Sequence, residues 1–241
     1  MRLESLQDSF LKSFLEQSWN DEQMPTLATV SADKMMVQAR GPVWHQKQKK
    51  QGIIPKGLHG LDQDATWSYS RTDGWVYGHG TFCIATHGIN FLGAFKWMPN
   101  SASEAKRLEI EIGRYERCVK VCCMDSKADD YPVYRKLKDT YDIQLLTTMR
   151  RNKIKSAERK QMWRELHTER HQRLYRQRRQ TVEPMQSLVK DIFDLERAWM
   201  RGNENNRWVF AAMGVAVQVA QRIAYQNGES TWRIKALVLG I

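Results

Sequence analysis

Glu183 lies four residues after Arg179 and seven residues before Lys190. On one continuous α-helix these offsets place the three side chains within about 40° of one another. An acid between two bases suits a metal-bound carboxylate that faces a polyanion. Ion pairs on an ordinary solvated helix give the same pattern. Pro184 disfavours α geometry at the residue before it, so a helix can also start there. In that case the relation of Glu183 to Lys190 is kept and the relation to Arg179 is lost.

The sequence that precedes Glu183 is strongly basic. Residues 150–179 contain twelve Lys or Arg against three Glu, while the whole chain has a net charge of +11. Positive charge that is concentrated in this way indicates a polyanionic partner, and nucleic acid is the first candidate. The predicted DNA-binding residues are Arg173, Arg176, Arg178, Arg179 and Lys190.

Two aspartates belong to predicted strands. Asp33 lies in the second half of a Thr-, Val- and Met-rich segment at 26–36, and Asp125 ends the nearly all-apolar segment 119–124. If these segments pair in a mixed sheet, the two carboxylates come close enough for a divalent cation to relieve their repulsion. Glu183 could supply a third ligand, and such oxygen ligands hold Mg²⁺ or Mn²⁺ for phosphodiester chemistry. The chain has 27 Asp or Glu, and a given one is more often a surface charge.

The hydrophobic pattern predicts an α/β fold with a mixed sheet flanked by helices. We expect a short N-terminal helix and linker over 1–25, followed by one catalytic domain over 26–241. Ser101 and Glu104 have capping-box spacing and predict the start of a helix that runs to about 116. The other expected elements are a helix at 3–17, strands at 26–36, 73–87, 91–98, 119–124 and 143–149, an irregular stretch at 40–70, helices near 130–141 and at 207–225, and a basic helical segment that continues through Glu183.

Composition narrows the class of protein. The chain of 241 residues is 41% hydrophobic and has nine Trp, which argues against disorder. Its longest apolar stretch, at 208–217, is too short to span a membrane, and the first residues lack a secretory core, so we expect a cytoplasmic protein. No cysteine pair has the spacing of a zinc site, and Cys122 and Cys123 are expected to be buried thiols.

These residues carry a resemblance over about 26–225. Asp33 on a first strand, the strand beginning Asp73-Gly-Trp-Val-Tyr-Gly, Asp125 ending a fourth strand, and Arg179-x3-Glu183-x6-Lys190 are together similar to the catalytic domain of DDE transposases of bacterial insertion sequences. The resemblance implies a ribonuclease H-like fold in which Asp33, Asp125 and Glu183 are the catalytic, metal-binding triad. It also implies two Mg²⁺ or Mn²⁺ ions, cleavage and strand transfer at transposon ends, and double-stranded end and target DNA as partners. From the same resemblance we expect a possible homodimer on DNA and an association with the nucleoid.

The chain departs from that family at several positions. Lys34 stands where Ser or Thr often follows the first Asp, and Ala128 stands where a Tyr is usual. Tyr175 is one position early, with Arg176 in its place. The first 25 residues leave no room for a separate DNA-binding region, and the 57 residues between Asp125 and Glu183 leave none for a large insertion domain. We therefore expect a bare, N-terminally truncated catalytic core.

The sequence supports two main functions. The first is a metal-dependent transposase that cleaves DNA and transfers strands. The second is a truncated or domesticated transposase that acts as a catalytically inactive DNA-binding or inhibitory protein. A nuclease of the same fold outside the transposases is a third, more distant reading.

Overall fold

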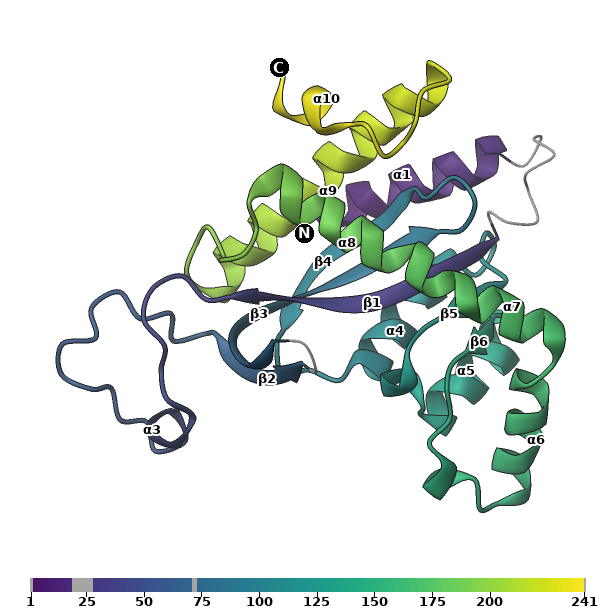
Figure 1. Cartoon of the computed structure of the whole chain (residues 1–241), viewed down its shortest axis with the longest axis horizontal. Helices are drawn as coiled ribbons and strands as arrows, with labels where there is room; N and C mark the ends of the chain where they lie inside the picture. Colours follow the sequence, from purple (N-terminus) through teal and green to yellow (C-terminus); the bar gives the residue numbers. More distant parts are fainter. Residues whose placement is uncertain (1, 19–27, 71–72, 241) are drawn as a thin grey trace.

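The computed structural model describes residues 2–18, 28–70 and 73–240. Figure 1 shows the chain, with the long helices packed around one sheet. In chain order the elements are α1 (Arg2–Ser18), β1 (Thr29–Gln38), α3 (Gln46–Lys50), β2 (Thr66–Ser70), β3 (Gly74–Thr86), β4 (Leu92–Pro99), α4 (Glu104–Ile112), η1 (Gly113–Tyr115), β5 (Val121–Cys123), η2 (Ser126–Ala128), α5 (Tyr131–Tyr141), β6 (Gln144–Leu146), η3 (Arg151–Lys153), α6 (Ala157–Leu166), α7 (Glu169–Gln177), η4 (Arg178–Gln180), α8 (Val182–Phe193), α9 (Asn203–Gln226) and α10 (Lys235–Leu239).

The sheet is mixed, as the pattern predicted. Its order is β2-β3-β1-β5-β6, with β4 paired to β3. Strands β1, β3 and β4 form an antiparallel meander, and β5 and β6 follow β1 in parallel after helical crossovers. This is the ribonuclease H-like arrangement, so the predicted fold class is confirmed. It puts β1, the strand of the first aspartate, in the centre.

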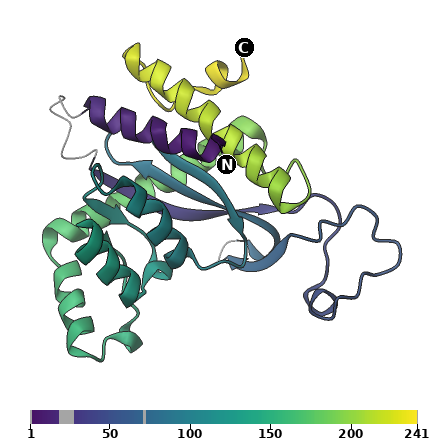
Figure 2. The same cartoon turned by 180° about the vertical axis from the view of Figure 1, so that it is seen from behind.

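Each face of the sheet has its own apolar core. Alternation along β1 sends Val30 and Ala32 to one face and Met35 and Val37 to the other. The first core is closed by residues of α1, α4 and α5, and the second by residues of α8 and α9. Figure 1 shows α8 lying across β1, and Figure 2 shows α1 beside α9 from behind. Helix α8 is therefore held on the face to which Asp33 belongs.

The N-terminal helix packs on the sheet. Gln7 of α1 donates to the carbonyl oxygens of Phe95 and Ala211 and accepts from the amide of Phe95 at 2.8 Å. Residues 19–27, which include the predicted linker and the start of the predicted first strand, lie outside the described residues. Among the described residues, no helix has the length and apolar character needed to cross a membrane.

The stretch predicted to be irregular, 40–70, contains the short helix α3 and the strand β2, so that prediction is wrong at its end. Strand β2 pairs with β3 from Thr66 opposite Gly78 to Ser70 opposite Gly74. The rest of the stretch projects from the sheet in Figure 1. It is fixed at its base by the buried pair of His79 and Asp62, whose Nε2 and Oδ2 atoms are 2.8 Å apart. The four cysteines are free and buried, as expected for Cys122 and Cys123.

Candidate metal centre

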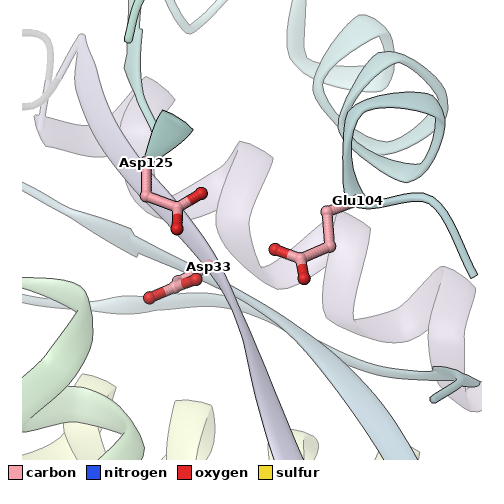
Figure 3. Close-up of side chains that lie close together, drawn as sticks. All are labelled: Asp33, Glu104 and Asp125. Carbon is pink, nitrogen blue, oxygen red and sulfur yellow. The ribbon is translucent and has the colours of Figure 1, made fainter. Parts of the chain in front are cut away.

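The structure brings Asp33 and Asp125 together. Strands β1 and β5 are direct parallel neighbours, with Ser31 opposite Cys123. If this register is continued by two residues in each of the two segments, Asp33 lies beside Asp125. One carboxylate oxygen from each aspartate and one from Glu104 all lie within 4.8 Å of one another. Figure 3 shows the three carboxyl groups converging from β1, from the end of β5 and from the start of α4. The predicted strand pairing and the proximity of the two aspartates are confirmed.

Local backbone structure fixes Asp125. Strand β5 ends at Cys123, and Asp125 caps the short helix η2, where its Oδ1 accepts from the amide of Lys127 at 2.9 Å. The hydroxyl of Thr147 donates to the carbonyl oxygen of Asp125 at 2.6 Å. The other carboxylate oxygen of Asp125 is thus left for contacts outside the cap.

Glu104 is a member of this group that the sequence analysis missed. The cap of α4 is Ser103, which accepts from the amide of Lys106, so the predicted capping box of Ser101 with Glu104 is wrong. Glu104 is the first helical residue, and its side chain is 3% exposed. Because it is not used as a cap, its carboxylate can face the two aspartates. The available signal was an acid at the start of the helix that follows the meander. The sequence analysis interpreted this acid as part of a capping box and did not consider it as a metal ligand.

Two lysines hold one oxygen of Glu104. Its Oε1 lies 3.2 Å from Nζ of Lys34 and 2.8 Å from Nζ of Lys127. Lys34 is itself fixed, because its Nζ donates to the carbonyl oxygen of Asn100 at 2.9 Å and to the hydroxyl of Ser68 at 3.2 Å. The second oxygen, Oε2, is buried and has no hydrogen-bond partner among the described residues.

The electrostatics of the cluster favour a bound cation. Burial raises the pKa of Asp33 to about 7, and the negative charges of Asp125 and Glu104 act in the same direction. The charge of Arg178 and the amide of Lys34 oppose this rise without cancelling it. Converging carboxylates with an unsatisfied oxygen form a hard, anionic donor set of the kind that binds Mg²⁺ or Mn²⁺. The residues therefore fit the divalent metal that the sequence predicted.

Glu183 lies outside this group of three carboxylates. It is in the first turn of α8, and its side chain is 49% exposed. Arg178 connects it to the cluster, since Nη2 of Arg178 is 3.5 Å from Oε1 of Glu183 and Nη1 is 3.4 Å from Oδ2 of Asp33. The guanidinium of Arg178 lies 6.0 Å from the centre of the Tyr175 ring.

Of the two alternatives for this segment, a continuous helix through Arg179, Glu183 and Lys190 is wrong. Arg179 lies in η4, and α8 begins at Val182, with Pro184 in its first turn. This is a favourable place for proline, because amides in the first turn of a helix have no partner within the helix. Glu183 and Lys190 share α8, as the alternative with a helix start near Pro184 predicted.

The predicted DNA-binding residues divide by exposure. Arg173, Arg176 and Arg179 are exposed, and Lys190 is half-buried. Arg178 differs from them, because its side chain is 8% exposed and faces the carboxylates of Asp33 and Glu183. Among the described side chains of residues 150–179, the other exposed bases are Arg150, Arg151, Lys155, Lys160, Arg164 and Arg170.

Comparisons with known structures give weak global matches. A synaptic complex of piggyBac transposase with hairpin DNA is 10% identical, with a TM-score of 0.48, over 97% of this chain and 57% of that one. A Mos1 strand transfer complex is 10% identical, with a TM-score of 0.29, over 73% of this chain and 58% of that one. A Mos1 mariner paired-end complex with Mn is 9% identical, with a TM-score of 0.28, over 91% of this chain and 62% of that one. The chain thus spans less than two thirds of each of these proteins.

The sequence comparison is more specific. No curated protein matches the chain. The family model described as a transposase DDE domain matches residues 94–222, more than half of the 241 residues. The matched part contains Glu104, Asp125 and Glu183, and Asp33 precedes it. On this match, the chain belongs to the transposase DDE domain family.

Proposed function

We propose that this domain cleaves DNA at the ends of an insertion sequence and transfers the cut strand to target DNA, with Mg²⁺ or Mn²⁺ as cofactor. The observation that carries the proposal is the convergence of Asp33, Asp125 and Glu104 within 4.8 Å, on strand β1, just after the parallel strand β5 and at the start of α4. The membership of the DDE family supports the same chemistry.

In this proposal Asp33 and Asp125 bind the divalent metal, and Glu183 completes the catalytic triad from α8. When bound, two such ions supply an activated nucleophile and charge stabilisation for an in-line displacement at phosphorus. Strand β1 holds Asp33 and the cap of η2 holds Asp125, while Arg178 orients Asp33 and Glu183 through contacts of 3.4 and 3.5 Å. Glu183 is half exposed, so it can reach a phosphate that lies on the surface.

The DNA contacts are proposed for the exposed bases next to this site. Arg173, Arg176 and Arg179 extend from α7 and η4, which directly precede the helix of Glu183. Lys190 lies two turns further along α8. Their positive charge suits the phosphates of double-stranded transposon ends and target DNA. A homodimer would bring two such sites to the two ends of one element.

One observation favours the second function, an inactive DNA-binding or inhibitory protein. Arg178 already supplies a positive charge to both Asp33 and Glu183, and its side chain is 8% exposed. A positive charge at this place competes with a divalent cation. If the arginine prevails when DNA is bound, the domain occupies DNA ends and does not cut them.

The test is a cleavage and strand-transfer assay with Mg²⁺ or Mn²⁺ on duplexes that carry the terminal repeats flanking the gene. Asp125→Asn and Glu183→Gln are each expected to lower cleavage by at least about 100-fold, because a site lacking an anionic ligand holds its cations too loosely. DNA binding should stay intact or become slightly tighter, since each change removes a negative charge beside phosphates.

Asp130→Asn is the matched control. Asp130 caps α5 by accepting from the amide of Val133 at 3.2 Å, and Asn caps helices equally well. This variant should retain full activity. Cleavage that survives in Glu183→Gln would refute the role of Glu183. A wild-type protein that binds the duplex without cutting it would favour the inhibitory function.

A further inference from the structure

We infer that Glu104 is a further metal ligand of this site, a carboxylate beyond the triad of Asp33, Asp125 and Glu183. The inference rests on the proposed metal-dependent function and deepens it. Its starting point is that Glu104, and not Glu183, is the glutamate within 4.8 Å of both aspartates.

The separations suit one shared cation. Ligand oxygens of one octahedral Mg²⁺ ion, with bonds of about 2.1 Å, are about 3.0 Å apart when adjacent and about 4.2 Å apart when opposite. A group of three oxygens within 4.8 Å of one another needs only small side-chain rotations to reach this geometry. Figure 3 shows the carboxyl group of Glu104 directed towards Asp33, across the space that Asp125 also faces.

The unsatisfied oxygen of Glu104 is independent evidence for a ligand. The side chain is 3% exposed, and Oε2 has no hydrogen-bond partner among the described residues. A buried polar atom without a partner costs about 1–3 kcal/mol, and more when it is charged. A cation bound beside Asp33 and Asp125 removes this cost, because it gives Oε2 a partner.

The two lysines position Glu104 without occupying that oxygen. Both contact Oε1, at 3.2 Å for Lys34 and 2.8 Å for Lys127. Lys34 stands where Ser or Thr often follows the first Asp in the resembled transposases, so this departure and the additional carboxylate occur together. Partners of this kind orient a ligand and set the direction of its free lone pairs.

Glu183 has a different environment. Its side chain is 49% exposed, and its nearest described charge is Arg178 at 3.5 Å. The inner position beside the aspartates therefore belongs to Glu104, and Glu183 approaches from the surface through α8.

The test is Mn²⁺ binding to the full chain without DNA, measured by isothermal titration calorimetry. Glu104→Gln is expected to weaken Mn²⁺ binding by at least about tenfold, since the loss of even an outer partner of a metal ligand costs this much. The matched control is Glu109→Gln on the same helix, which carries the same chemical change. Glu109 pairs with Lys136 and lies outside the cluster, so its variant should bind Mn²⁺ like the wild type.

Three outcomes separate this inference from the proposed function. Unchanged Mn²⁺ affinity in Glu104→Gln, together with weakened binding in Asp125→Asn, would overturn the role of Glu104 and leave the metal site in place. A wild-type chain that binds no Mn²⁺ would overturn both. Weakened binding in Glu104→Gln and Asp125→Asn, but not in Glu109→Gln, supports both.

A second variant distinguishes loss of a metal ligand from loss of folding. Glu104→Gln leaves the buried Lys34 without its acid, which is strongly destabilising in general. Lys34→Met/Glu104→Gln removes both charges of the pair at once. This double variant should show the same weakening of Mn²⁺ binding, and wild-type affinity in a folded double variant would overturn the inference. Melting curves recorded for each variant establish that it is folded.

Discussion

Two regions of this domain collect charge in opposite ways. The carboxylate cluster (Asp33, Glu104 and Asp125) brings negative charges within 4.8 Å in a largely buried place between strand β1, the end of β5 and the start of α4. The basic segment (residues 150–179) contains twelve bases, and most of those whose side chains the structure describes are exposed. One region concentrates charge where water is scarce, and the other presents it to solvent.

This difference determines how each region can act. Buried charges are weakly screened, so the cluster has a large electrostatic cost that a specific cation relieves. Exposed bases are screened by salt and contribute to affinity through released counterions, with little preference for sequence. The cluster therefore fits chemistry at one phosphate, and the basic segment fits retention of DNA of any sequence.

The largest expected effect is on the pH dependence of stability. Burial and the charges of Asp125 and Glu104 raise the pKa of Asp33 to about 7 in the folded state, from its ordinary value of 3.8. Between these values the folded state binds the proton more tightly than the unfolded state. The free energy of unfolding should therefore fall as pH rises from about 4 to 7, by at most about 1.4 kcal/mol per pH unit from this group. Asp33→Asn should remove this contribution, as measured by urea unfolding across pH in EDTA.

Above pH 7, where Asp33 is ionised, added Mg²⁺ should restore part of the lost free energy of unfolding, because it binds the ionised carboxylates. The control is Asp142→Asn at an exposed carboxylate, where the hydrogen bond from Lys120 lowers the pKa. Any effect of that group lies at low pH and has the opposite sign. Parallel pH profiles for the wild type and Asp33→Asn would contradict the electrostatic account of the cluster.

The next effect concerns the basic segment. Replacing Arg173, Arg176 and Arg179 by Ala should reduce the slope of log K against log salt by about 2.7, because each phosphate contact contributes about 0.9. At physiological salt this corresponds to binding on the order of 100-fold weaker, or about 3 kcal/mol, for all duplexes alike. Fluorescence anisotropy over a salt series measures it.

A triple Ala variant at Lys120, Arg135 and Lys136 is the comparison. These three bases are exposed but pair with Asp142, Asp139 and Glu109, so they should contribute little to DNA binding. An unchanged slope in the arginine variant would mean that the basic segment is only a solvated surface.

The sequence was sufficient for the features that depend on strand order and charge density. An aspartate within a first strand and another at the end of a buried strand must meet if those strands pair in parallel, and they do. The sequence was insufficient where a shift in the start of a helix decides which way a side chain points. A start of α4 defined by Ser103 and not by Ser101 turns Glu104 from a cap into a member of the cluster. Local residue types were compatible with both, and tertiary packing selected one.

The same limit applies to two consecutive arginines, and they provide the smallest and sharpest test. Arg178 is 3.4 Å from Asp33 and 8% exposed, whereas Arg179 is exposed. The positive charge of Arg178 lowers the pKa of Asp33 against the effects of burial and like charge. Arg178→Met should therefore move the Asp33 transition in the pH profile upward, by about one pH unit for an interaction of about 1.4 kcal/mol. Arg179→Met makes the same chemical change one residue later and should leave the transition in place while weakening DNA binding. Equal shifts in both variants would mean that the two regions are coupled only through long-range charge, and that the contact between Arg178 and Asp33 has no special role.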